Sequence, residues 1–183
     1  MSEEKKPDTA ADIYSCVARG ISRLDGDPKK SGSSIRQAKA EKPIWRHAFS
    51  GDVCEDIRAW GLLQRNMPEG LRREYGPPSY EENAIFMAMA AYAACGSHAD
   101  GVSLGKAAAY VDARERFTRL ENSSDINEFW RNLKDLLRLI TSKKGTGVDY
   151  RLLAKSIYFW QFDHVREAIN LEREYYYKKG EEK

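Results

Sequence analysis

The chain has 183 residues, of which 42% are hydrophobic, so it can bury the core of one domain or of two small lobes that share a core. Its 30 basic residues face 28 acidic ones, which excludes a polybasic protein that coats nucleic acid through net charge alone. The cysteines Cys16, Cys54 and Cys95 are widely spaced and form no CxxC pair, so they support neither a disulfide framework nor a zinc site.

The apolar stretches of the chain do not have the length of a membrane span. Residues 84–95 form the longest of them, shorter than the roughly 20 residues that cross a bilayer. Residues 1–9 have no apolar core of the signal-peptide kind, and we expect them and residues 179–183 to be disordered. We therefore expect a cytoplasmic protein that has no membrane partner.

Helical periodicity dominates the first half of the chain. Ile13, Val17 and Ile21 lie on one stripe of a helix predicted over 10–24. A loop of turn-forming residues follows, and then a short basic segment over 34–40. Pro43 is predicted to start a new helix, and an amphipathic helix around 53–64 is closed by Pro68.

The clearest helix-breaking segment in the chain is Gly76-Pro-Pro. After it, Ser79 and Glu82 have the spacing of a capping box. The helix that this box opens runs to Cys95 and is apolar on nearly every side. Such a helix must be surrounded by others, so we predict that it is the central core helix, with Gly96 as its C-cap.

The second half of the chain is predicted to add five helices. Ser103 caps a short helix over 104–111, and a basic helix around 114–120 follows. Residues 126–140 carry a long apolar stripe, and two last helices cover 150–160 and 165–177. Since no alternating pattern exceeds five residues, we predict an all-α bundle of about eight helices, with lobes over 10–95 and 96–178.

The residues that enzymes use do not form a recognisable set. His47, His98 and His164 lie on unrelated elements, and no local nucleophile motif accompanies them. The segment 101–106 resembles a phosphate loop but lacks the first glycine and the final hydroxyl residue, so Gly105 is better explained by close helix packing. We predict no catalytic residue, no metal site and no cofactor.

Basic side chains cluster locally despite the balanced total. Residues 29–73 hold ten basic against five acidic residues, and residues 114–144 hold eight against five. Two rows on neighbouring helices would make a groove for phosphates, which requires repeated positive charge and carries no sequence information. The predicted nucleic-acid-binding residues are Lys29, Lys30, Arg36, Lys39, Arg116, Arg119, Arg131, Lys134, Arg138, Lys143 and Lys144.

Aromatic residues gather near the C-terminus. They could form a platform on which bases stack, but aromatic residues at helical spacing more often pack in a core or at an interface. We predict that Trp160, Tyr175 and Tyr176 contact a protein partner.

The order of several short segments resembles the CasB-type small subunit of the type I-E CRISPR surveillance complex, Cascade. The segments that carry the resemblance are Gly101-Val-Ser-Leu-Gly-Lys-Ala107, Arg116-Phe-Thr-Arg-Leu120, Leu137-Arg138-Leu-Ile-Thr141, Val148-Asp-Tyr-Arg-Leu-Leu-Ala154, Trp160 and, upstream, Ser33-Ser-Ile-Arg-Gln37 with the apolar helix over 84–96. The chain departs from the family at Gln37, where relatives have a second arginine, and over 121–125, where they often place more.

This resemblance implies a non-catalytic subunit that stabilises the guide RNA–target DNA heteroduplex and the displaced strand. The implied partners are the backbone and large subunits of Cascade, a second copy of this chain, the guide RNA, and the target and non-target DNA strands. Three alternatives remain at this point: a pure protein scaffold, a stand-alone helical DNA-binding regulator, and a nuclease whose acidic residues and histidines meet only in the fold.

Overall fold

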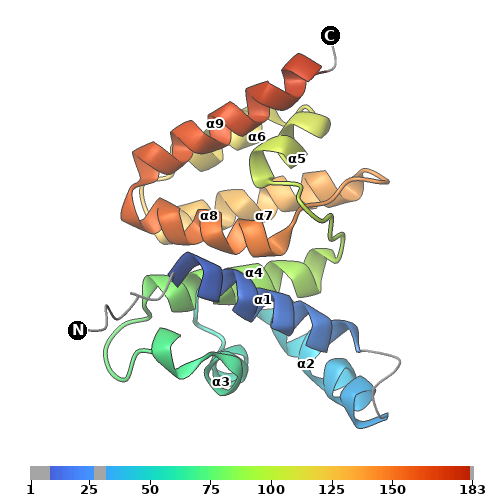
Figure 1. Cartoon of the computed structure of the whole chain (residues 1–183), viewed down its shortest axis with the longest axis vertical. Coiled ribbons are helices and arrows are strands. Elements are labelled where there is room, and N and C mark those ends of the chain that lie inside the picture. The colour runs from blue at the N-terminus through green and yellow to red at the C-terminus, as the bar shows by residue number, and fades with distance from the viewer. Residues whose placement is uncertain (1–8, 27–31, 182–183) are drawn as a thin grey trace, which may run out of the picture.

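Helices form nearly all of the ordered structure in the computed structural model, which describes residues 9–26 and 32–181 and their side chains up to residue 177 (Figure 1). The described residues contain no strand, so the all-α prediction is confirmed. The helices are α1 (Thr9–Asp25), α2 (Gly32–Ser50), α3 (Ile57–Asn66), η1 (Glu69–Leu71, a 3₁₀ turn), α4 (Tyr80–Cys95), α5 (Leu104–Tyr110), α6 (Arg114–Glu121), α7 (Ile126–Ser142), α8 (Tyr150–Phe162) and α9 (His164–Glu181).

Helix α4 is the centre of the bundle, as its composition predicted. The capping box is complete, because Ser79 accepts from the backbone N–H of Glu82 and the Glu82 side chain accepts from that of Ser79. Gly96 ends the helix with a φ of +70°. Every residue over 84–93 is buried, and α1, α2, α7 and α8 surround the helix. Neither α4 nor any other helix in the described ranges is long and apolar enough to cross a membrane.

The helices before and after Gly96 share one core. In Figure 1, α1–α4 form the lower part of the molecule and α5–α9 the upper part, with α8 lying along α1 and α4. One continuous cluster of buried side chains extends from Ile13 in α1 to Tyr175 in α9. The two groups of helices are therefore joined by apolar packing rather than by a linker.

Helix α2 differs from the prediction, because it continues through Pro43 instead of restarting there. Ala38, Trp45 and Ala48 are buried on one side of α2, so packing holds both parts of the helix in line against α4. Pro43 lies on the exposed side, where the carbonyl that loses its partner can bind water. Tertiary packing thus outweighs the local cost of the proline.

Gly105 lies where α5 meets α9, and the structure confirms that close packing explains this glycine. A Cβ at this position would be 2.5 Å from the carbonyl oxygen of Leu171 and 2.7 Å from the Cβ of Glu174. Only a residue without a side chain allows the backbones of the two helices to approach this closely.

We predict that Gly105→Ala lowers the free energy of unfolding by about 2 kcal/mol, since the added methyl group forces α5 away from α9. The matched control is Gly61→Ala in α3, where a Cβ meets nothing within 4 Å and the change should stabilise the protein by about 0.5–1 kcal/mol. Urea denaturation of both variants measures the difference. Equal effects of the two substitutions would contradict the proposed packing.

Candidate nucleic-acid interface

Helix α7 carries the longer basic row beside its apolar stripe. Asp125 caps the helix by accepting from the backbone N–H groups of Asn127 and Glu128. The apolar side of the helix packs inward, and Arg131 and Arg138 are exposed on the polar side. Lys134 belongs to the same predicted row but is only 8% exposed. The row is therefore interrupted at its middle residue.

Lys134 is a structural residue in this fold. Its Nζ donates to the carbonyl oxygen of Gly51 at 3.1 Å, and Trp130 Nε1 donates to the same oxygen at 3.0 Å. Burial lowers the pKa of Lys134. The two donors hold the segment that follows α2 against α7, so the amino group of Lys134 is engaged inside the protein, and its predicted contact with nucleic acid stays a prediction.

The basic row of α6 meets that of α7 at Asp135. Arg116 Nη1 donates to the carbonyl oxygen of Asp135 at 3.1 Å, and Arg138 Nη1 lies 3.3 Å from its carboxylate. The guanidinium of Arg138 also lies 5.4 Å from the ring centroid of Phe49, at the end of α2. Arg119, in contrast, pairs with Glu115 on its own helix. Arg116 and Arg138 are therefore brought together, and both remain exposed.

A second row lies on α2, where Arg36, Lys39, Lys42 and Arg46 follow one another at helical spacing. Arg46 Nε donates to the carbonyl oxygen of Ala93, at the C-terminal end of α4, at 2.8 Å. Lys42 Nζ lies 5.6 Å from the ring centroid of Tyr92. The α2 row is thus held along the end of α4.

The rows of α2 and α7 meet at a shallow groove of about 430 Å³ that Arg46 and Arg138 line together with Thr141 and Ser142. Sequence reasoning missed Lys42 and Arg46. The helical spacing from Arg36 to Arg46 was a usable signal, but the predicted break at Pro43 separated Arg46 from the residues before it.

The remaining basic residues predicted to bind nucleic acid lie outside the groove at Arg46 and Arg138 or outside the described residues. Lys29 and Lys30 lie outside the described residues. Lys143 is exposed, but its Nζ donates to the carbonyl oxygen of Val111 at 2.9 Å and so ties the end of α7 to the end of α5. Lys144 is exposed beside it. The region that gathers exposed basic groups from two helices is therefore the one around Arg46 and Arg138.

Two of the three aromatics predicted to contact a protein partner are buried in the core, and the partner contact itself stays a prediction. Trp160 is 6% exposed, and its ring centroid lies 4.4 Å from that of Phe129. Tyr175 is fully buried and stacks on Phe117. Tyr176 is 58% exposed, so it is the member of the set that a partner can reach.

We predict that Trp160→Ala lowers the free energy of unfolding by about 3–5 kcal/mol, because it leaves a cavity between α7 and α8. Tyr176→Ala should change it by less than about 1 kcal/mol, since the ring is largely in water. Chemical denaturation followed by far-UV circular dichroism measures both values. A small effect of Trp160→Ala would show that the ring is not a core element.

One group of three possible metal ligands occurs in the described residues, namely His98, Asp100 and Asp149. Arg151 occupies this group, with its guanidinium bonded to Asp100 and, at 2.7 Å, to Asp149. Although burial opposes the charge of Asp149, hydrogen bonds from Arg151 and from the backbone of Gly101 lower its pKa to about 2. The arrangement is an ion-pair network that fixes the start of α8, with Asp149 buried and Asp100 exposed.

The bundle defines a class of small all-α proteins, and exposed arginines of its second and seventh helices line one groove. The family model described as CRISPR-associated protein Cse2 matches residues 35–176. The chain therefore belongs to the Cse2 family of CRISPR-associated proteins.

Solved structures of CasB proteins share the fold. CasB from Thermus thermophilus is 18% identical with a TM-score of 0.68, and the match covers 91% of this chain and 97% of that one. CasB from Thermobifida fusca is 17% identical with a TM-score of 0.64 at the same coverage. CasB from M. ruber is 14% identical with a TM-score of 0.66 and 95% of its chain covered. Among curated proteins, no sequence matches.

Proposed function

We propose that this protein is the non-catalytic small subunit of a Cascade CRISPR interference complex, and that its α2–α7 basic surface contacts nucleic-acid backbone without reading sequence. Membership of the Cse2 family supports the first part. The observation that carries the second part is the meeting of two exposed basic rows at the groove lined by Arg46 and Arg138.

The chemistry of this surface fits phosphate rather than bases. Arginine guanidinium groups bind phosphate oxygens through paired N–H donors, and such contacts position a backbone without reporting its sequence. Opening a target duplex while the guide pairs with one strand is nearly balanced in free energy, so a few backbone contacts shift the equilibrium. A chain with a net charge of +2 supplies these contacts without binding DNA indiscriminately.

The proposal extends to the partners of the complex. The subunit would lie beside the backbone and large subunits, next to a second copy of itself, and would support the guide RNA–target heteroduplex and the displaced DNA strand in the cytoplasm during antiviral defence. It would do so as a structural component, since its cluster of possible metal ligands is filled by the guanidinium of Arg151.

A purely structural scaffold is the second candidate, and one observation favours it. Several predicted nucleic-acid contacts are already engaged inside the protein: Lys134 with Gly51, Lys143 with Val111 and Arg119 with Glu115. If the remaining exposed residues also served only packing, the subunit would act by spacing its neighbours.

We predict that the triple variant Arg46→Glu, Arg131→Glu, Arg138→Glu weakens target-DNA binding by a reconstituted complex about ten-fold or more at physiological salt. Each lost phosphate contact should also lower the slope of log affinity against log salt by about one. Filter binding at several salt concentrations, with permanganate footprinting of the opened strand, measures both effects.

The control is the double variant Arg166→Glu, Arg173→Glu, whose side chains are exposed on α9, a helix that carries neither basic row. It should assemble and bind as the parent does. Assembly and thermal stability of the triple variant are checked first. Unchanged R-loop formation by an intact complex that carries the triple variant would favour the scaffold instead.

A further inference from the structure

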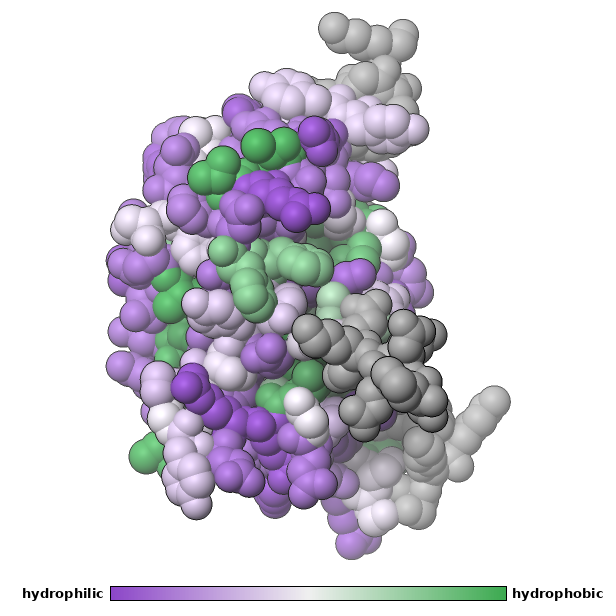
Figure 2. All heavy atoms as spheres, turned by 60° about the vertical axis from the view of Figure 1, so that its left-hand side comes forward, coloured by the Kyte–Doolittle hydropathy of each residue, from purple (hydrophilic) through white to green (hydrophobic). Residues whose placement is uncertain are grey.

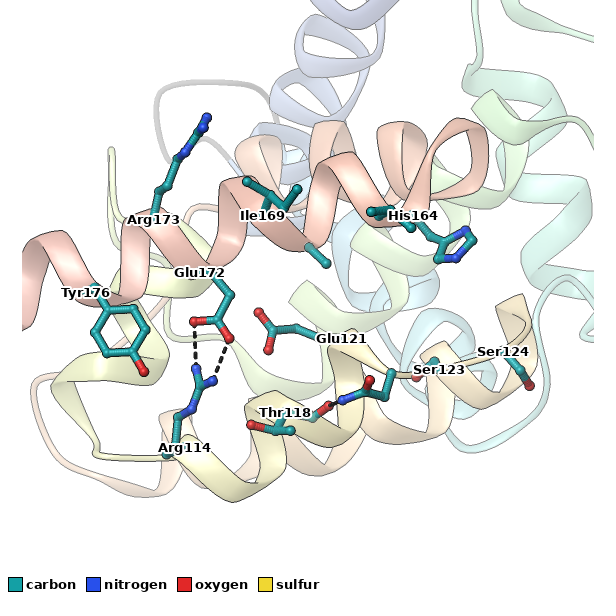
Figure 3. Close-up of a pocket in the computed structure, with 13 residues that line it drawn as sticks. Arg114, Thr118, Glu121, Ser123, Ser124, His164, Ile169, Glu172, Arg173 and Tyr176 are labelled. Atoms are coloured by element: carbon teal, nitrogen blue, oxygen red, sulfur yellow. Dashed lines mark hydrogen bonds and ion pairs between the residues drawn. The ribbon is translucent and has the colours of Figure 1, made fainter.

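A groove of about 910 Å³ lies between α6 and α9, and its charged groups compensate one another (Figure 3). Arg114 forms a two-pronged ion pair with Glu172, at 2.8 and 2.5 Å. Burial and the neighbouring Glu172 raise the pKa of Glu121 to about 8, so this carboxyl group is largely uncharged at pH 7. Arg173 points away from the groove (Figure 3). The α6–α9 groove therefore selects no ligand by charge.

A second pocket, of about 270 Å³, lies among α1, α2, α3 and α4, and its charge is not balanced. Three arginines line it, Arg19 and Arg23 from α1 and Arg65 from α3, and none of the described residues that line it is acidic. This pocket, the α1–α3 pocket, shares no residue with the groove at Arg46 and Arg138. It is therefore a separate basic site.

The floor of the α1–α3 pocket is apolar and held in place by helix packing. Leu62 of α3 and Ile85 and Met89 of α4 line it, and each is at most 3% exposed. A Cβ at Gly20 would lie 2.6 Å from Sδ of Met89, so this glycine lets the backbone of α1 approach α4 closely. The floor is thus part of the core of the bundle, and an apolar ligand body would extend that core.

The floor also holds a buried hydrogen-bond donor that has no acceptor in the protein. Trp45 of α2 lines the pocket and is 1% exposed, and its ring packs edge to face on Phe86. Its Nε1 has no hydrogen-bond partner among the described residues. An indole N–H can only donate, and a buried donor is costly to leave without an acceptor. An acceptor atom on a bound ligand would satisfy this group.

The charge of Arg23 is compensated inside the protein. Its Nε donates to the carboxylate of Glu41 at 3.0 Å, and its Nη1 donates to Oδ1 of Asn66 at 2.5 Å. Glu41 is buried on α2 and also accepts a hydrogen bond from Gln37 at 2.9 Å. This network ties α1 to α2 and to the end of α3, and so shapes one wall of the pocket.

Arg19 and Arg65 keep an uncompensated charge at the rim of the pocket. Both are exposed, and no carboxylate in the described part of the chain pairs with either. Nε of Arg65 donates to the carbonyl oxygen of Gly61, on its own helix, at 3.3 Å. Arg19 interacts with the thiol of Cys16, and burial raises the pKa of this thiol, which therefore carries no counter-charge at pH 7. In Figure 2, hydrophilic side chains cover most of the lower part of the molecule, at the level of α3 in Figure 1.

We propose that the α1–α3 pocket binds a small amphipathic anion, a function beyond the proposed contact with nucleic acid. The apolar body of the ligand packs on the floor, an acceptor atom bonds to Nε1 of Trp45, and a carboxylate or phosphate head pairs with Arg19 and Arg65. Charge selects an anion, because three guanidinium groups face a single carboxylate, that of Glu41. The volume lies at the small end of ligand sites, which favours a small molecule over a stretch of polymer.

The test uses the full-length chain and four probes of similar shape. 4-Methoxybenzoate has both the charged head and the acceptor, 4-methoxybenzamide lacks the charge, 4-ethylbenzoate lacks the acceptor, and 4-methoxyphenyl phosphate exchanges the head. Isothermal titration measures affinity, and ¹⁵N spectra with an assigned indole resonance of Trp45 locate the site. We expect 4-methoxybenzoate to bind about ten-fold or more tightly than 4-methoxybenzamide and to shift the indole N–H of Trp45 downfield.

The other two probes separate the contributions of the acceptor and of the head. 4-Ethylbenzoate should bind about three-fold more weakly than 4-methoxybenzoate and leave the indole N–H of Trp45 unshifted, because it offers no acceptor. The tighter of the carboxylate and phosphate probes identifies the head group that the site prefers, and either result supports the site.

The double variant Arg19→Gln, Arg65→Gln should abolish the preference for 4-methoxybenzoate over 4-methoxybenzamide and leave the affinity for the amide unchanged. The matched control Arg166→Gln, Arg173→Gln also removes two exposed arginines, both from α9, and should retain the preference. Because all four positions are exposed, both variants should fold as the parent does, which circular dichroism and thermal denaturation check first.

The proposal is overturned if no probe binds at millimolar concentration, if the benzoate and the benzamide bind equally, or if shifts are confined to residues outside α1–α4. Equal affinity for inorganic phosphate and 4-methoxyphenyl phosphate would also overturn it, since the floor would then contribute nothing. Displacement of a probe by a short DNA strand that shifts the same resonances would assign the pocket to nucleic acid, with the same consequence. The triple variant of Arg46, Arg131 and Arg138 should bind the probes normally, so failure of one proposal leaves the other intact.

Discussion

The burial of α4 is the constraint on which the rest of the structure depends. A helix whose residues 84–93 are all buried must be covered on every side, and α1, α2, α7 and α8 provide the cover. This requirement places α2 and α7 against the same helix although 75 residues separate their adjoining ends, Ser50 and Ile126. Phe49 and Trp130 pack edge to face between them, with ring centroids 5.3 Å apart.

The basic surface is a consequence of that packing. Because α2 and α7 both pack on α4, the C-terminal end of α2 reaches α7, and Arg46 and Arg138 line one groove at the end of α4. The contact between the end of α2 and α7 also engages Lys134, whose amino group donates a hydrogen bond to the carbonyl oxygen of Gly51, just after α2 ends. Trp130 donates to the same oxygen, so the two side chains together tie the end of α2 to α7 and engage the amino group of Lys134 inside the protein. One interhelical contact thus both creates the basic surface and limits its extent.

Local chemistry explains which features the sequence alone could predict. The capping box at Ser79, the C-cap at Gly96 and the all-round apolar character of α4 each depend on residues within one helix, and all were predicted correctly. The tight approach at Gly105 was likewise readable from one residue. The continuity of α2 through Pro43 depends on tertiary packing, which the local pattern does not contain. Periodicity also identified aromatics near the C-terminus, but it does not distinguish the buried Tyr175 from the exposed Tyr176, which are neighbours on one helix.

The structure explains how a chain with nearly equal numbers of acidic and basic residues still has a local basic surface. Many acidic and basic groups neutralise each other inside the protein, as in the contacts of Arg151 with Asp149 and of Arg114 with Glu172. Among the exposed basic groups, Arg46 and Arg138 come together at the α2–α7 groove. A strongly basic protein would attract nucleic acid over its whole surface. Internal pairing of charges therefore keeps the net charge near zero while it leaves a local basic surface at this groove.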